Sequence, residues 1–74
     1  MYSIVYDKIR TVAVLGDNKE GWQKELAIVS WNGGEAKYDI RTWGPEGKMT
    51  KGATLTRTEA ARLVEALQEE LCRR

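Results

Sequence analysis

The sequence contains no histidine and a single cysteine, and both scarcities exclude classes of functional site. Without an imidazole there is no Ser-His or Cys-His pairing for nucleophilic catalysis and no histidine ligand for a metal ion. The carboxylates from Asp7 to Glu46 are scattered singly, so neither a paired acid and base nor a hard-metal cluster is indicated. We therefore expect a protein that is not an enzyme and that uses no cofactor, no metal and no small-molecule substrate.

The single cysteine, Cys72, has no second thiol in the chain, so an intrachain disulfide is excluded. A reducing compartment suits such a chain, and we expect the cytoplasm. Residues 1–10 include Asp7, Lys8 and Arg10 and lack the continuous apolar core of a signal peptide. No apolar run is long enough to span a bilayer, so we expect no membrane association.

A large excess of one charge sign is also lacking, because 12 Lys and Arg stand against 11 Asp and Glu, a net charge of +1. Such a chain does not coat DNA by bulk attraction, so any nucleic-acid site must be a local patch. The chain is short enough for one domain, residues 1–74. A domain of this size buries only about 60% of its unfolded surface. With disulfides and histidine metal sites excluded, oligomerisation is the remaining candidate for stabilising it.

Turn-forming residues cluster at positions 16–21, 32–34 and 44–47. The runs between them are rich in Val, Ile, Thr, Trp and Tyr and predict an antiparallel meander of four strands, at residues 11–15, 22–31, 36–43 and 50–55. After these runs the apolar period becomes helical, and Thr56 and Glu59 have the spacing of a capping box. The predicted fold class is α+β, a four-stranded antiparallel sheet followed by one C-terminal amphipathic helix.

One helix can cover only one face of such a sheet, so the other face must be solvated, paired with a second subunit, or used in binding. Residues 36–43 alternate apolar and charged side chains. We expect Tyr38 and Ile40 to face the helix, and Lys37, Arg41 and Trp43 to lie on the uncovered face. Cationic groups beside flat aromatic rings bind phosphates and unstacked bases together. This pattern therefore predicts a single-stranded nucleic-acid site.

Trp31 joins this face in one of two possible hairpin registers. A two-residue turn at Gly33 and Gly34 places Trp31 beside Tyr38 on the helix side, whereas a three-residue loop with a bulge, residues 32–34, places it beside Lys37. We favour the three-residue loop because it keeps the apolar side chains of the preceding strand on the helix side.

Four segments of the sequence resemble the single-stranded-DNA-binding transcriptional coactivators of the positive cofactor four type, in the short stand-alone form found in bacteria. They are E-L-A-I-V-S-W-N, K-Y-D-I-R-T-W, P-E-G-K-M and K-G-A-T-L-T. Members of this family have a four-stranded sheet followed by a helix, form homodimers through the helix and neighbouring sheet, and bind single strands without marked sequence preference. The resemblance implies a homodimer that binds single-stranded DNA in transcription regulation, replication or repair.

The resemblance also implies a set of site residues in which cations and indoles lie together. The predicted nucleic-acid-binding residues are Lys24, Trp31, Lys37, Arg41, Trp43 and Lys51. Arg41 and Lys51 would contact the nucleic-acid backbone and the two tryptophans would stack bases, whereas the other two lysines rest more on strand parity than on a motif. Residues 33–35 at the hairpin tip stand where the family has lysines, which implies weaker binding.

Other interpretations of the same residues stay open at this point. Core packing is the alternative for Trp31 and Trp43, because tryptophan is highly buried on average, and Trp22 is expected to have a packing role. A solvated strand of mixed charge is the alternative for residues 37–41. RNA is an open alternative to DNA. The alternative function is a protein–protein interaction module that uses the bare sheet face or the dimer helix.

Overall fold

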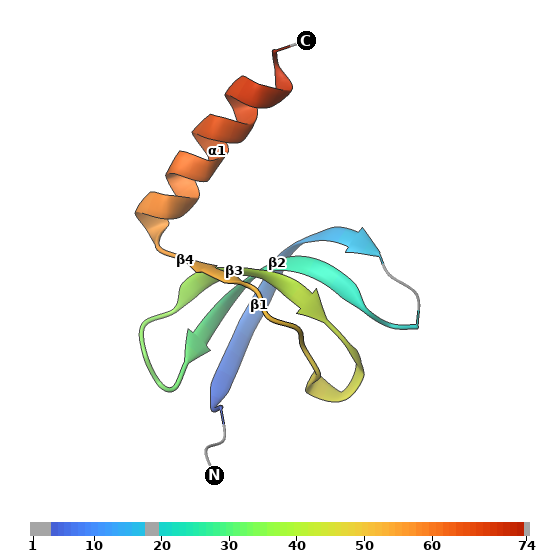
Figure 1. Ribbon diagram of the computed structural model, residues 1–74. Coiled ribbons are helices and arrows are strands. Elements are labelled where there is room, and N and C mark those ends of the chain that lie inside the picture. Colours follow the sequence, from blue (N-terminus) through green and yellow to red (C-terminus); the bar gives the residue numbers. More distant parts are fainter. Residues whose placement is uncertain (1–3, 18–19, 74) are drawn as a thin grey trace.

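The computed structural model describes residues 4–17 and 20–73 of the 74-residue chain. Its elements in chain order are β1 (Tyr6–Asp17), β2 (Gln23–Trp31), β3 (Lys37–Trp43), the short 3-10 helix η1 (Pro45–Gly47), β4 (Ala53–Leu55) and α1 (Arg57–Leu71). The strands form one antiparallel sheet in the order β1-β2-β3-β4 (Figure 1). The predicted fold class, a four-stranded antiparallel sheet followed by one helix, is therefore confirmed.

The first strand is longer than predicted. It begins at Tyr6 instead of Thr11, and its pairing with β2 shifts register after Lys8, after Thr11 and after Val14. Each shift inserts an extra residue, which bends a strand and increases its twist. The turn predicted after β1 includes residues 18 and 19, which lie outside the described residues.

The hairpin between β2 and β3 has the favoured register. Trp31 lies on the face of Lys37, because Lys37 pairs with Val29 and strand residues alternate between faces. The turn closes with a 2.9 Å hydrogen bond from the Gly34 N–H to the Trp31 carbonyl oxygen, and residues 32 and 33 both have positive φ. Val29 is two residues before Trp31, whereas its partner Lys37 is three residues after Gly34. The extra residue on the β3 side is the predicted bulge.

The two faces of the sheet differ in chemistry. The aromatic face carries Trp31, Asp39, Arg41 and Trp43, and the apolar face carries Leu26, Ile28, Tyr38 and Ile40. The alternation is as predicted, but the burial is reversed. Ala27 and Val29, on the aromatic face, are fully buried, whereas the four residues named for the apolar face are only half-buried. The small core therefore lies on the aromatic face.

The prediction that α1 covers the apolar face is wrong. The helix leaves β4 and projects away from the sheet, and none of its residues is buried (Figure 1). Its capping box is present as predicted, because the Glu59 N–H donates to Thr56 Oγ1 at 3.1 Å and the Thr56 N–H donates to Glu59 Oε1 at 2.8 Å. Local sequence therefore determines where the helix begins but not where it points. Within the described residues, no helix is long and apolar enough to cross a bilayer.

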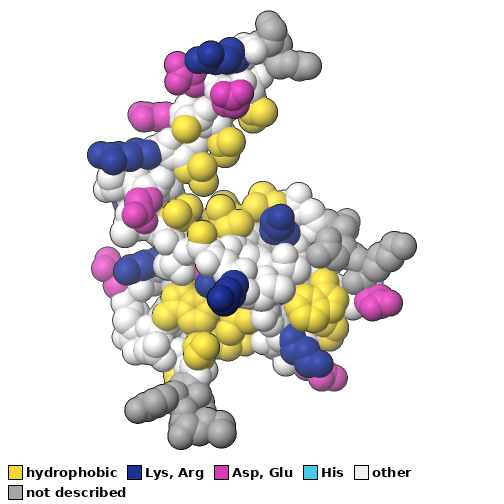
Figure 2. All heavy atoms as spheres, viewed as in Figure 1, with side chains coloured by type: hydrophobic (Ala, Val, Ile, Leu, Met, Phe, Trp, Pro, Cys, Tyr) yellow, Lys and Arg dark blue, Asp and Glu magenta, His cyan; other side chains and the backbone are white. Residues whose placement is uncertain are grey.

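An open groove of about 480 Å³ lies between α1 and the apolar face. Its lining is mainly aliphatic and includes Leu26, Ile40, Leu55, Leu63 and Leu67. Figure 2 shows hydrophobic side chains on the side of α1 turned toward the sheet and along the adjoining margin of the sheet. Nothing in residues 4–17 and 20–73 covers this apolar surface.

Candidate nucleic-acid interface

The aromatic face is built around three rings. Tyr6, which pairs with Trp31 across the β1–β2 ladder, has its ring centroid 5.6 Å from those of both Trp31 and Trp43. Its hydroxyl donates a hydrogen bond to the Gly47 carbonyl oxygen at 3.2 Å, which ties β1 to the loop after β3. The three rings therefore form one cluster that joins β1, β2 and β3.

The two predicted stacking platforms differ in exposure. Trp31 is half-buried, but Trp43 is only 5% exposed because Tyr6 and Met49 pack against it. The prediction that Trp43 is exposed is therefore wrong. The predicted first strand begins at Thr11 and therefore leaves out Tyr6 and Lys8, which lie against Trp43 from β1. The indole N–H groups of both tryptophans are buried and have no acceptor among the described residues, so ring contacts hold them in place.

Each indole has a cation over its ring. The guanidinium carbon of Arg41 lies 4.5 Å from the Trp31 ring centroid, and the Lys8 ammonium lies 4.6 Å from that of Trp43. Such contacts contribute about 0.5 to 2 kcal/mol each, and more as water is excluded. The sequence prediction that cations and indoles share one face is confirmed for Arg41 with both tryptophans, and the structure adds Lys8.

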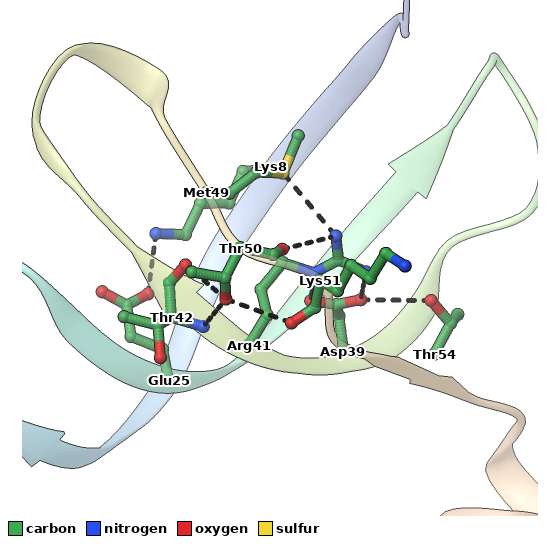
Figure 3. Close-up of polar contacts among 9 residues, drawn as sticks. All are labelled: Lys8, Glu25, Asp39, Arg41, Thr42, Met49, Thr50, Lys51 and Thr54. Atoms are coloured by element: carbon green, nitrogen blue, oxygen red, sulfur yellow. Dashed lines mark hydrogen bonds and ion pairs between the residues drawn. The ribbon is translucent and has the colours of Figure 1, made fainter.

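A fully buried carboxylate holds Arg41 in this position (Figure 3). Arg41 donates from Nε and Nη2 to the two carboxylate oxygens of Asp39, at 2.6 and 2.8 Å, and the Thr54 hydroxyl donates to Asp39 at 3.1 Å. The Nη1 group of Arg41 also donates to the Thr50 carbonyl oxygen at 3.3 Å. With 13% of its side chain exposed, Arg41 has most of its donors occupied inside the protein.

Lys8 is held by a second buried carboxylate, that of Glu25 (Figure 3). The Lys8 ammonium is 2.7 Å from Glu25 Oε1, which also accepts from the Thr11 hydroxyl at 2.9 Å, and Gln23 donates to Oε2 at 3.0 Å. Burial alone would raise the pKa of Glu25, but the hydrogen bonds from Lys8, Gln23 and Thr11 outweigh it and lower the pKa below its ordinary value. Glu25 is therefore a stable anion beneath the cation.

The K-G pair at Lys51 and Gly52 has a steric explanation. A methyl group on Gly52 would overlap the Arg41 Cβ and the Ile40 carbonyl oxygen, so only glycine allows this segment to lie directly against the Arg41 side chain. Lys51 is exposed, and its neighbour Thr50 already contacts Arg41. The glycine therefore places an exposed lysine at the border of the aromatic face.

The other two predicted lysines lie on different faces. Lys37 is exposed at the start of β3 and, by alternation, belongs to the aromatic face with Arg41. Lys24 pairs with Thr42 on β3 and therefore belongs to the apolar face. The structure brings Trp31, Lys37, Arg41, Trp43 and Lys51 together and separates Lys24 from them.

Sequence reasoning missed Tyr6 and Lys8. The strand-like run Y-D-K-I-R before Thr11, in which Tyr6 and Lys8 are two residues apart, is the signal that could have revealed them. Trp22 has a packing role, as expected, because its ring lies so close to Gly44 that a methyl group there would come within 2.6 Å of the indole.

Comparison with known proteins relates the chain to a family and to a bacterial protein. The family described as Transcriptional Coactivator p15 (PC4) matches residues 18–66. A protein of Treponema pallidum (strain Nichols), described as an uncharacterized protein, is 46% identical over 63 residues, which cover 84% of this chain and 74% of the relative. The family match contains β2, β3, β4 and the first part of α1, and it begins after the end of β1.

Proposed function

Because the chain belongs to the family of the transcriptional coactivator p15 (PC4), we propose that it binds single-stranded DNA on its aromatic face, with little preference for sequence. The observation that supports this most directly is the guanidinium of Arg41 over the Trp31 ring, with 4.5 Å from its carbon to the ring centroid, on a face bordered by the exposed Lys37 and Lys51. Family membership supports a DNA-binding role of the coactivator type. The restriction to single strands and the residue roles are our proposal.

Three kinds of group share the binding. Bases stack on the half-buried Trp31 and on the guanidinium plane of Arg41, at about 1 to 3 kcal/mol per base. Lys37 and Lys51 contact phosphates, because both are exposed at the border of this face. Trp43 supports the surface from beneath, since it is too buried to stack with a base itself. The mechanism is binding without turnover.

We also propose that two copies associate through α1 and the apolar face. The helix exposes Val64 by 52% and Leu67 by 48%, and the groove beside it is lined mainly by aliphatic side chains. A domain of this size cannot easily leave such a surface in water, and a second copy brings an identical aliphatic helix. Dimerisation would place two aromatic faces in one particle, which would lengthen the strand of DNA that is held.

Titration with nucleic acid tests the proposed function. The protein is mixed with oligo-dT, a duplex of the same length and an RNA of the same length while tryptophan fluorescence is followed. We expect quenching by oligo-dT at the lowest concentration. With two phosphates neutralised per protomer by Lys37 and Lys51, the slope of log affinity against log salt is about −1.4 per protomer or steeper. The absence of a response to all three at low salt would refute the proposal and favour the protein-interaction module.

A pair of lysine variants locates the binding face. Lys37→Gln removes an exposed cation from the aromatic face, and Lys24→Gln removes one from the opposite face of the same sheet. We expect Lys37→Gln to reduce the salt slope by about 0.7 per protomer, whereas Lys24→Gln leaves it unchanged. Equal effects of the two variants would mean that the aromatic face is not the binding face.

A further inference from the structure

We propose that the nucleic-acid interface continues onto β1, outside the segment matched by the family, and that Lys8 is a phosphate contact there. The inference rests on the proposed function and extends it to a strand that the family match does not include, because that match begins at residue 18. β1 ends at Asp17. Neither Lys8 nor any other β1 residue was among the site residues predicted from the sequence.

The surface is physically continuous from β3 to β1. Tyr6 contacts the rings of both tryptophans, and Lys8 lies over the ring of Trp43. Lys8 pairs with Val29 in the β1–β2 ladder, as Lys37 does in the β2–β3 ladder, so the two lysines flank β2 on the same face. A single strand that contacts Lys37 and Trp31 therefore has a further cation available on the next strand but one of the sheet.

Lys8 has donors to offer although it is already paired. Its ammonium carries three N–H groups, and Glu25 Oε1 accepts one of them at 2.7 Å. The exposure of the pair is unequal, because 28% of the Lys8 side chain is exposed against 6% for Glu25. The carboxylate therefore lies beneath the ammonium, and the cation faces the solvent.

Arg41 is less available by the same comparison. Its side chain is 13% exposed, and Nε, Nη1 and Nη2 all donate to protein atoms. A phosphate at Arg41 would compete with Asp39, whereas a phosphate at Lys8 can use N–H groups that Glu25 leaves unoccupied. Glu25 contacts the Lys8 ammonium where it lies over Trp43, without occupying all of its N–H groups.

The test compares the unmodified protein with two variants in the oligo-dT titration from 0.1 M to 1 M salt. Lys8→Gln removes the proposed contact. Arg10→Gln makes the same charge change on β1, but Arg10 pairs with Ile28 and is exposed on the apolar face. We expect Lys8→Gln to reduce the salt slope by about 0.7 per protomer. The loss of affinity caused by the substitution is then about fivefold larger at 0.1 M salt than at 1 M salt. Arg10→Gln should keep the slope of the unmodified protein.

A second comparison separates loss of binding from loss of folding, because Lys8→Gln leaves the Glu25 carboxylate without its cation. Glu25→Gln alone keeps Lys8, and the double variant Lys8→Gln with Glu25→Gln leaves no unpaired charge. We expect Glu25→Gln to bind at least as tightly as the unmodified protein at low salt, and the double variant to show the reduced slope. If the unmodified protein binds and the slopes of Lys8→Gln and the double variant equal that of Arg10→Gln, the inference is wrong and the proposed function stands. If the unmodified protein fails to bind, the proposed function itself is wrong.

Discussion

Gly52→Ala is the substitution for which the structure gives the sharpest expectation. The added methyl group would overlap two groups that cannot easily move, the Arg41 Cβ and the backbone carbonyl oxygen of Ile40, and would lie 2.9 Å from Arg41 Nε. Arg41 is anchored by two hydrogen bonds to Asp39, which is fully buried, so its side chain cannot simply rotate away. The segment that carries Lys51 must therefore separate from β3.

The magnitude follows from two opposing effects. Forced overpacking typically costs about 1 to 3 kcal/mol. Replacement of glycine by alanine also restricts the unfolded chain, which returns about 0.4 to 1 kcal/mol where the native backbone permits it. We expect the free energy of unfolding to fall by about 1 to 2 kcal/mol, which lowers Tm by roughly 4 to 16 °C in a domain of this size.

Urea denaturation followed by tryptophan fluorescence measures this effect, with Gly16→Ala as the matched control. A methyl group on Gly16 meets no atom within 4 Å, and Gly16 lacks the positive φ that makes alanine unfavourable. Gly16→Ala should therefore leave stability unchanged or raise it slightly. If the two alanine variants unfold at the same urea concentration, then Gly52 is not held against Arg41 and the description of this border of the site fails.

Three further predictions follow from burial and charge. Trp43→Ala should lower the free energy of unfolding by about 3 to 5 kcal/mol, because Trp43 is 5% exposed. An unchanged midpoint in urea denaturation would contradict the burial of Trp43. The folded-state pKa of Glu25 lies below its ordinary value of 4.5, so its contribution to stability is present above about pH 4.5 and is lost as the pH falls through the folded-state pKa. Melting curves from pH 6 to pH 2 should therefore fall less steeply for Glu25→Gln than for the unmodified protein, and parallel curves would refute this. Leu67→Lys, which removes an apolar side chain that is 48% exposed on α1, should give a monomer by sedimentation equilibrium while Gln68→Lys remains a dimer, and a dimeric Leu67→Lys would exclude α1 from the interface.

The hairpin and the helix start show what a sequence of this kind can reveal. The apolar pattern of β2 and the alternation of β3 allow one register that keeps Leu26 and Ile28 on the same side as Tyr38, and that register is the one observed. The capping box at Thr56 likewise needs only residues that are close in the sequence. Both features were predictable because local geometry decides them.

The exposure of the tryptophans shows where such prediction stops. Alternation assigns Trp31 and Trp43 to the same face as Arg41, but it does not state which face is buried. That depended on Tyr6, which reaches Trp43 from a distant part of the chain, and on how the loop after β3 folds back so that Met49 packs on the same cluster. The strand-like run around Lys8 indicates a strand, but the contact of Lys8 with the Trp43 ring is visible only in the structure.

The amino-acid sequence by itself determined the order of the strands, the start of the helix and the grouping of cations with indoles, because each depends on periodicity or on neighbouring residues. The tertiary structure alone decided which face became the core, that α1 projects away from the sheet, and which carboxylate holds which cation. Those outcomes depend on contacts between β1, β3 and the loop after β3, and a pattern along one strand carries no information about the partners that fold over it.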